Sequence, residues 1–149
     1  MNNKQSKIVN QLEEILEKNR DAQKGYKKAA ENAKDSRLKS YFEKKSMDRN
    51  GFNMSLKNEL VANYDEIDDA GSFTGTIHRA WMDVKSLFSA DDDEAMLEEA
   101  IKGDKAAVEE YDEVLEDSNL PQALIQLLRE QKNAIRADLS KIKSLEDLA

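Results

Sequence analysis

Few residues of this chain belong to the types that carry out catalysis or bind metal ions. Its 149 residues include a single histidine, His78, and no cysteine. The lack of cysteine excludes disulfide bonds, thiolate metal sites and cysteine nucleophiles, and one histidine excludes any site within one chain that needs two imidazoles. The sequence also contains no P-loop, dinucleotide-binding or Gly-x-Ser-x-Gly motif. We therefore expect no catalytic residues and no cofactor.

The most distinctive local group of side chains surrounds the histidine. His78, Trp81 and Lys85 would share one face of a helix, because their spacing is i, i+3 and i+7. Such a group could bind a small anionic ligand or a partner. In the alternative interpretation, which we favour, Trp81 and Ile77 anchor this segment on the rest of the protein and His78 joins a hydrogen-bond network. One imidazole without a nearby nucleophile is weak evidence for catalysis.

The elements that position these residues are amphipathic helices. The chain has 36% charged residues, one proline and five glycines, a composition typical of long helices. Apolar residues recur at alternating steps of four and three, which is the seam spacing of a left-handed helical bundle. We predict four long helices and one short one, at about residues 6–33, 36–63, 76–88, 92–117 and 121–147.

The connections between these helices predict the architecture. Only a residue or two separates the first two helices, so they should form an antiparallel hairpin. The connection between the second and third long helices, by contrast, is long enough to run the length of a bundle. We therefore predict an all-α four-helix bundle with one long crossover that contains a short extra helix. Residues 1–149 form one domain in this prediction.

Each long helix carries one polar residue on its apolar stripe, near the middle of the helix. These residues are Asn19, Arg49, Asp104 and Gln131. If the helices pack side by side, the four residues lie at similar heights and form a buried polar cluster. A buried charge is costly unless it is paired, so Arg49 and Asp104 are the expected ion pair. The cluster could fix the register of the helices or be a binding or reaction centre, and we favour the structural interpretation because it lacks sufficient metal ligands.

The charge distribution limits the classes of partner. The formal net charge is -8, which opposes generic binding to nucleic acid or anionic membranes. Basic residues such as Lys44 and Lys45 alternate with acidic ones, and we interpret them as solvated helix faces. No apolar run approaches the length of a membrane span or a signal peptide. We expect a cytoplasmic protein that has no nucleic-acid or membrane partner and is compatible with a protein partner or a homo-oligomer.

The connectivity and the seven-residue pattern resemble the ferritin-like superfamily, including the rubrerythrins. In that superfamily the first and third helices each supply a ligand glutamate, and the second and fourth each supply Glu-x-x-His. The segment from Asn19 to Tyr26 resembles the first-helix segment in which the ligand glutamate precedes a tyrosine by seven residues, and Asn19 occupies the position of that glutamate. The run 97–104 resembles the third-helix motif, and Asp104 occupies the position of its ligand glutamate. The resemblance implies that the ligand positions are held by Asn19, Arg49, Phe52, Asp104, Arg136 and Leu139. At most one ligand of six is then retained.

A second resemblance covers nearly the whole chain. A bacterial family of ferritin-like four-helix-bundle proteins of unknown function has a crossover signature similar to residues 71–85, which read Gly-Ser-Phe-Thr-Gly-Thr-Ile-His-Arg-Ala-Trp-Met-Asp-Val-Lys. Residues 21–30 and the pair Gly103-Asp104 also resemble this family. The resemblance implies the fold and implies no activity.

Three functions remain open from the sequence. The first is a non-enzymatic ferritin-like bundle that acts as a structural, stress-related or interaction protein, with Arg49 and Asp104 at the position of a di-iron centre. The second is a metal-dependent oxidoreductase, with di-iron or di-manganese bound by carboxylates off the seam, such as Glu13, Glu17, Glu43 or Glu110. The third is a small-ligand-binding module at the crossover, around His78 and Trp81.

Overall fold

The computed structural model describes residues 3–64, 81, 92–117 and 119–148, with side chains from Lys7 onward. Its four long helices are α1 (Asn3–Asn32), α2 (Ser36–Asn63), α4 (Asp93–Leu115) and α5 (Gln122–Lys141), and a 3-10 turn (Leu145–Asp147) follows α5. The described residues form no strand. The prediction of an all-α four-helix bundle is confirmed. The predicted short helix at 76–88 lies outside the described residues, apart from Trp81.

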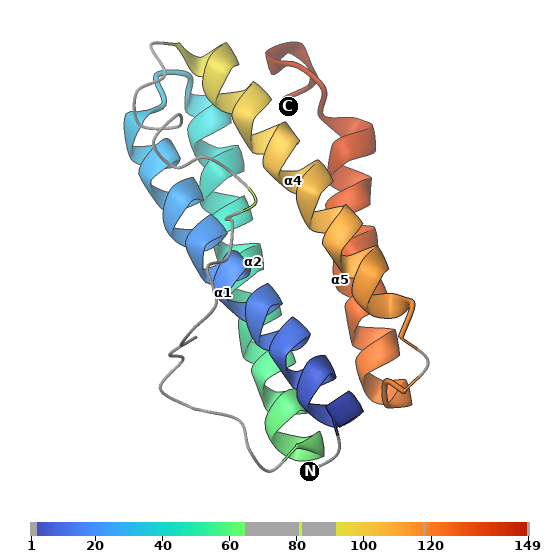
Figure 1. The fold of residues 1–149 in the computed structure, drawn as a ribbon. Coiled ribbons are helices and arrows are strands. Elements are labelled where there is room, and N and C mark those ends of the chain that lie inside the picture. Colours follow the sequence, from blue (N-terminus) through green and yellow to red (C-terminus); the bar gives the residue numbers. More distant parts are fainter. Residues whose placement is uncertain (1–2, 65–80, 82–91, 118, 149) are drawn as a thin grey trace.

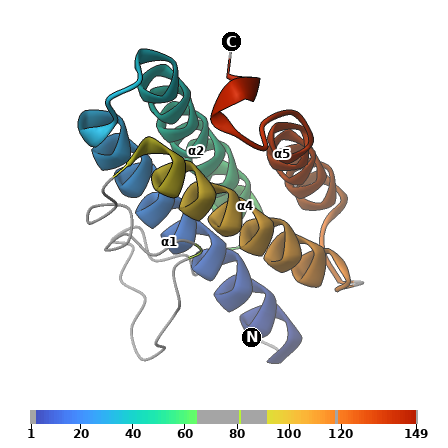
Figure 2. The ribbon, with the colours of Figure 1, turned by 90° about the horizontal axis from the view of Figure 1, so that it is seen from above.

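The directions of the helices agree with a long crossover between the two halves of the bundle. In Figure 1, α1 and α5 run one way, whereas α2 and α4 run the other way, so α2 ends and α4 begins at opposite ends of the bundle. The turn after α1 contacts the start of α4, because the backbone N–H groups of Lys34 and Asp35 donate to the Asp93 carboxylate at 3.0 and 2.6 Å. Figure 2 shows the four helices from above, with α4 beside α1 and α5 beside α2.

Short polar side chains determine where two of the helices begin. Asp35 accepts from the backbone N–H of Arg37 at 2.7 Å at the start of α2, and Asp92 accepts from that of Ala95 at 2.7 Å at the start of α4. Both carboxylates satisfy N–H groups that have no partner within the helix, and their charge suits its positive end.

The predicted end of the fourth helix is wrong. α5 ends at Lys141 and does not continue to residue 147. Instead the chain turns at Ile142, where the Asp147 carboxylate accepts from the backbone N–H groups of Lys143 and Ser144 at 2.9 and 3.1 Å. This turn buries Ile142 and Leu148 against one end of the bundle, so local capping and tertiary packing together end the helix early.

The core consists of two apolar clusters with a polar layer between them. One cluster surrounds the α1–α2 turn and includes Phe42 and Leu97; the other fills the opposite end and includes Leu12 and Leu124. Between them, at the middle of the helices, the buried residues are polar or charged: Asn19, Lys45, Arg49, Asp104 and Gln131. The four helices thus bring one polar residue or more from each to the same level of the interior.

Within the part of the chain that the structure describes, no helix has the length and apolar character needed to cross a membrane.

Candidate functional site

Asp104 on α4 is the centre of the polar layer. Its Oδ1 accepts from Arg49 Nη2 of α2 and from the Tyr26 hydroxyl of α1, each at 2.6 Å, and its Oδ2 accepts from Lys45 Nζ of α2. The Asp104 and Arg49 side chains are both 1% exposed, and that of Lys45 is 3% exposed. One buried carboxylate therefore pairs with two buried cations.

Lys45 has a second carboxylate within reach. Its Nζ donates to Asp138 Oδ2 of α5 at 3.2 Å, and it lies 5.4 Å from the centre of the Tyr26 ring and 5.8 Å from that of Tyr41. The two cations and two carboxylates balance in charge, which is the condition under which buried ions are tolerated. Our interpretation of Lys45 as part of a solvated face is wrong, because the rotation of α2 points it into the bundle.

The Arg49 guanidinium is held on several sides. Nη1 donates to Asn19 Oδ1 at 2.7 Å, and the guanidinium carbon lies 5.9 Å from the Tyr26 ring centre and 5.4 Å from the Trp81 ring centre. Burial is the largest single effect and works against the charged form, but the charge of Asp104, the two buried tyrosines Tyr26 and Tyr111 and the hydrogen bond to Asp104 together outweigh it, so the pKa of Arg49 is raised. Arg49 is a permanent cation enclosed by its partners.

A chain of neutral groups continues from Asn19 to α5. Asn19 Nδ2 donates to the Tyr111 hydroxyl at 3.0 Å, which in turn donates to Gln131 Oε1 at 2.7 Å. Gln131 Nε2 then donates to the backbone carbonyl of Phe52 at 3.0 Å. The structure thus places Asn19, Arg49 and Asp104 together, whereas Gln131 joins them only through Tyr111.

The two tyrosines of the network occupy equivalent places on α1 and α4. Tyr26 follows Asn19 by seven residues, and Tyr111 follows Asp104 by seven. The hydrogen bonds are reciprocal: the α1 tyrosine donates to Asp104 of α4, and the α4 tyrosine accepts from Asn19 of α1. Sequence reasoning missed both tyrosines as members of the cluster, although the repeated spacing could have indicated them.

Tyr26 and Tyr111, the two tyrosines of the network, both have pKa values above the ordinary value of 10.0, so they stay neutral at pH values where a free tyrosine ionises. Burial, followed by the charge of Asp104, raises the pKa of Tyr26 well above its ordinary value of 10.0. Burial also raises the pKa of Tyr111 to about 12. Their hydroxyls therefore act as hydrogen-bond donors throughout the physiological range.

Trp81 is the one described residue of the predicted crossover site. It is buried, its ring centre lies 6.0 Å from that of Tyr111, and its Nε1 donates to Glu110 Oε1 at 3.2 Å. Glu110 also accepts from Lys18 Nζ. The other two residues of the predicted site, His78 and Lys85, lie outside the described residues.

The donor set of the polar layer does not fit a metal centre. The oxygens of its one fully buried carboxylate accept from Arg49, Lys45 and Tyr26, and two fixed positive charges would repel a divalent cation there. Among the described residues, no three or more carboxylate or imidazole side chains are grouped so that they could hold a metal ion.

The carboxylates proposed for the alternative metal site are dispersed. Glu17 accepts from Arg20 Nη1 at 2.8 Å, Glu110 is occupied by Lys18 and Trp81, and Glu43 is exposed. Glu13 is half-buried on α1. The four lie on three helices, and the described residues do not gather them into a metal-binding group.

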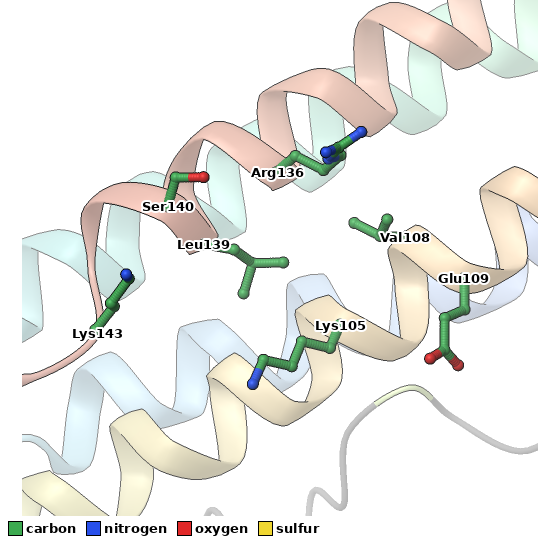
Figure 3. A pocket seen from close by; sticks show the side chains of 7 residues that line it. All are labelled: Lys105, Val108, Glu109, Arg136, Leu139, Ser140 and Lys143. Atoms are coloured by element: carbon green, nitrogen blue, oxygen red, sulfur yellow. The ribbon is translucent and has the colours of Figure 1, made fainter.

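Of the two residues that the resemblance placed at ligand positions on α5, Arg136 is exposed and Leu139 is a half-buried residue packed against the apolar core. They line a surface groove of about 450 Å³ between α4 and α5, together with Lys105, Val108, Glu109, Ser140 and Lys143. Figure 3 shows Val108 and Leu139 pointing toward each other between the helices, with charged side chains around them. The α5 residues that face the polar layer are Gln131, as the apolar stripe predicted, and Asp138, whereas Arg136 and Leu139, the ligand positions implied by the resemblance, contribute no contact to it.

The space beside the ionic network is much smaller. A cavity of about 10 Å³ lies among residues that include Lys45, Arg49 and Asp138. This volume is about that of one water-sized probe. This cavity, which is lined by described residues, has no room for a substrate.

Comparison with known families gives one match. Residues 7–117, which include α2, most of α1 and all of α4, match the model of a domain of unknown function, DUF2383. No curated protein matches the sequence. Because the match covers most of the chain, the protein belongs to this DUF2383 family.

Proposed function

We propose that this protein is a ferritin-like bundle that uses a closed ionic network where metal-binding relatives would hold ions, and that it acts as a non-enzymatic structural or interaction protein. The observation that carries the proposal is that both carboxylate oxygens of Asp104 are engaged in hydrogen bonds with buried side chains. Both of its oxygens accept from buried cations, and one also accepts from a tyrosine. A carboxylate engaged in this way is not a free ligand, base or nucleophile.

The ferritin-like assignment is supported by the helix directions and by the resemblance of Asn19 to Tyr26 and of the run ending at Asp104. In a bundle with α2 and α4 running the same way, a long connection must join the two hairpins (Figure 1). The substitution of ligands by Asn19 and Arg49 would then remove the redox chemistry that the architecture carries elsewhere.

Iron oxidation tests the non-enzymatic assignment. We expect the full-length protein to oxidise ferrous iron in air no faster than an equal concentration of serum albumin, because no described group of ligands can bind and activate the metal. A di-iron ferritin-like enzyme, assayed in parallel, controls for the quality of the iron and oxygen. Catalytic turnover above the albumin blank would contradict the proposal, and loss of that turnover in D104N would locate it in the polar layer.

The groove between α4 and α5 supports a second candidate function, the binding of a small amphipathic carboxylate. Lys105, Arg136 and Lys143 surround the apolar side chains of Val108 and Leu139, so the groove joins cationic and apolar surface (Figure 3). Glu109 is its one acidic lining residue, which leaves a local positive charge on an acidic protein. A ligand with an anionic head and a short apolar body matches both parts.

Calorimetric titration with decanoate tests this candidate. We expect binding by the wild type and at least a tenfold loss of affinity in R136E, because tenfold corresponds to about 1.4 kcal/mol and the change reverses one charge at the groove. R129E is the matched control, since Arg129 is also exposed on α5 but does not line the groove. Equal affinities of R136E and R129E, or no binding by the wild type, would exclude this groove as the site.

A further inference from the structure

The outer side of α2 carries an apolar stripe that no described element covers. Its large members are Met47, Met54 and Val61, which are 74%, 62% and 52% exposed. With Gly51 and Asn58 between them, the positions follow one another at steps of four, three, four and three. We call these five residues the α2 outer stripe. Its spacing is that of a helix–helix seam, and it lies opposite the inward face that contains Arg49 and Leu56.

The packing of the single chain does not explain why residue 51 of α2 is a glycine. It lies near the middle of α2, where glycine costs about 1 kcal/mol relative to alanine. It is exposed, and a Cβ added to it would have no atom within 4 Å. Nothing inside the described chain therefore requires its missing side chain. A glycine in the centre of a helical seam is expected where the backbone of another helix approaches closely.

We propose that the α2 outer stripe is the interface of a homodimer, in which α2 packs antiparallel against α2 of a second copy about a two-fold axis near Met54. In this arrangement Met47 lies opposite Val61 of the partner subunit. Each Met54 fits beside the small residues Gly51 and Ser55 across the axis, in the manner of a knob in a hole. The inference names a partner for the interaction role proposed above, and its test is separate from that of the polar layer.

The symmetry of the stripe favours a second copy over an unrelated helix. Met47 and Val61 lie seven positions before and after Met54, so these three apolar positions match themselves when the direction is reversed, whereas Gly51 then lies opposite Lys57 of the partner subunit. Asn50 and Asn58 lie four positions before and after Met54, which places Asn50 opposite Asn58 of the partner subunit. Two amides can donate to and accept from each other, and such a pair fixes the register of a seam. Self-matching surfaces of this kind are what a two-fold dimer requires.

Charge also favours this face for self-association. The chain carries a net charge of -8, so two copies repel each other over most of their surfaces. The α2 outer stripe contains no charged residue, and its nearest flanking charges on α2 include both signs, at Lys44 and Asp48. Depletion of charge and enrichment in methionine are features of the centre of protein interfaces.

Sedimentation equilibrium of the full chain, from low micromolar to submillimolar concentration, tests the proposal. We expect a monomer–dimer equilibrium in the wild type and at least tenfold weaker association in M54K, which brings two like charges to the axis. G51Q should also weaken association at least tenfold, yet raise the urea midpoint of the monomer, because the open space accepts the side chain and glutamine favours the helix. Q126K and A137Q, at exposed positions of α5, are the matched controls and should associate like the wild type.

Cysteine cross-linking tests the direction of packing, since the natural chain has no cysteine. Under mild oxidation M54C should form a disulfide-linked dimer, whereas N133C on exposed α5 should not. A mixture of M47C and V61C should cross-link more than either variant alone. Three outcomes would overturn the antiparallel α2 dimer. The wild type could stay monomeric, or its association could be unchanged by both M54K and G51Q. In the third, M47C alone would cross-link to itself more strongly than the mixture of M47C and V61C cross-links. In the monomeric case the stripe would serve a different partner.

Discussion

Replacing Asp104 by asparagine is expected to lower the free energy of unfolding by about 3–5 kcal/mol, which would shift the urea midpoint by about 2 M. The substitution keeps the shape of the side chain but removes the negative charge that pairs with both Arg49 and Lys45. Lys45 retains Asp138 at 3.2 Å, whereas Arg49 retains only the neutral Asn19 amide and the aromatic rings. A buried guanidinium without an anion is the main source of the loss. Fluorescence of Trp81, whose ring lies 5.4 Å from Arg49, reports the unfolding transition.

The control for this prediction is D112N on the same helix. Asp112 accepts from Lys132 at 2.8 Å, but its side chain is 51% exposed, so its ion pair is screened by solvent. We expect a loss of about 0–1 kcal/mol there. If D104N and D112N unfold at the same urea concentration, Asp104 does not neutralise buried cations.

The contacts of the network also predict how strongly different substitutions within it lower the free energy of unfolding. R49M should lower the free energy of unfolding less than D104N, because Asp104 keeps Lys45 and Tyr26 as partners. The combination K45M/R49M/D104L should recover most of the loss of D104N, since replacing a buried ionic group as a whole by apolar residues is often nearly neutral. This order separates neutralisation of charge from a simple loss of packing volume.

Raising the pH above 10 is expected to destabilise the fold steeply. The unfolded chain loses tyrosine protons near pH 10, whereas Tyr26 and Tyr111 stay protonated in the fold because their pKa values are raised. The unfolded state therefore binds fewer protons than the native state, and stability falls as pH rises. Each tyrosine contributes up to about 1.4 kcal/mol per pH unit once its unfolded form is ionised, so the pair gives a loss of about 3 kcal/mol between pH 10 and pH 11.5.

Parallel alkaline titrations of phenolate absorbance and far-ultraviolet circular dichroism check this prediction. Phenolate should appear together with the loss of helix, because the network tyrosines ionise only when the bundle opens. The variant Y26F/Y111F, compared with the wild type by urea unfolding at each pH, should show a shallower fall of stability above pH 10. Complete ionisation of all the tyrosines near pH 10 in a chain that keeps its helical signal would contradict the account.

The fold could be predicted from the sequence because its helices obey a simple pattern. Alternating steps of four and three define the inward faces of the helices, and Asp35 and Asp92 start helices in the way their side chains suggest. The pairing of Arg49 with Asp104 follows from the cost of burying either charge alone. In the structure these two residues lie 2.6 Å apart between Arg49 Nη2 and Asp104 Oδ1.

The rest of the site depends on details that a seam pattern does not contain. Lys45 and Ser46 fit the stripe of α2 almost equally well, and only the rotation of the packed helix buries the lysine. On α5, the stripe predicts the inward position of Gln131, but the pattern does not show that Asp138 reaches Lys45, a contact that depends on the packing of α5 against α2. The end of α5 likewise depends on contacts of Ile142 and Leu148 with distant parts of the core.

The central claim is that an ionic network, and not a metal centre, occupies the middle of the bundle. The most direct test is the metal content of protein purified without chelators and then equilibrated separately with ferrous iron, manganese and zinc, measured by elemental analysis after desalting. We predict less than one metal ion per chain in every case, with the same content in the wild type and D104N. Stoichiometric binding of one or two ions per chain that is lost in D104N would contradict the claim.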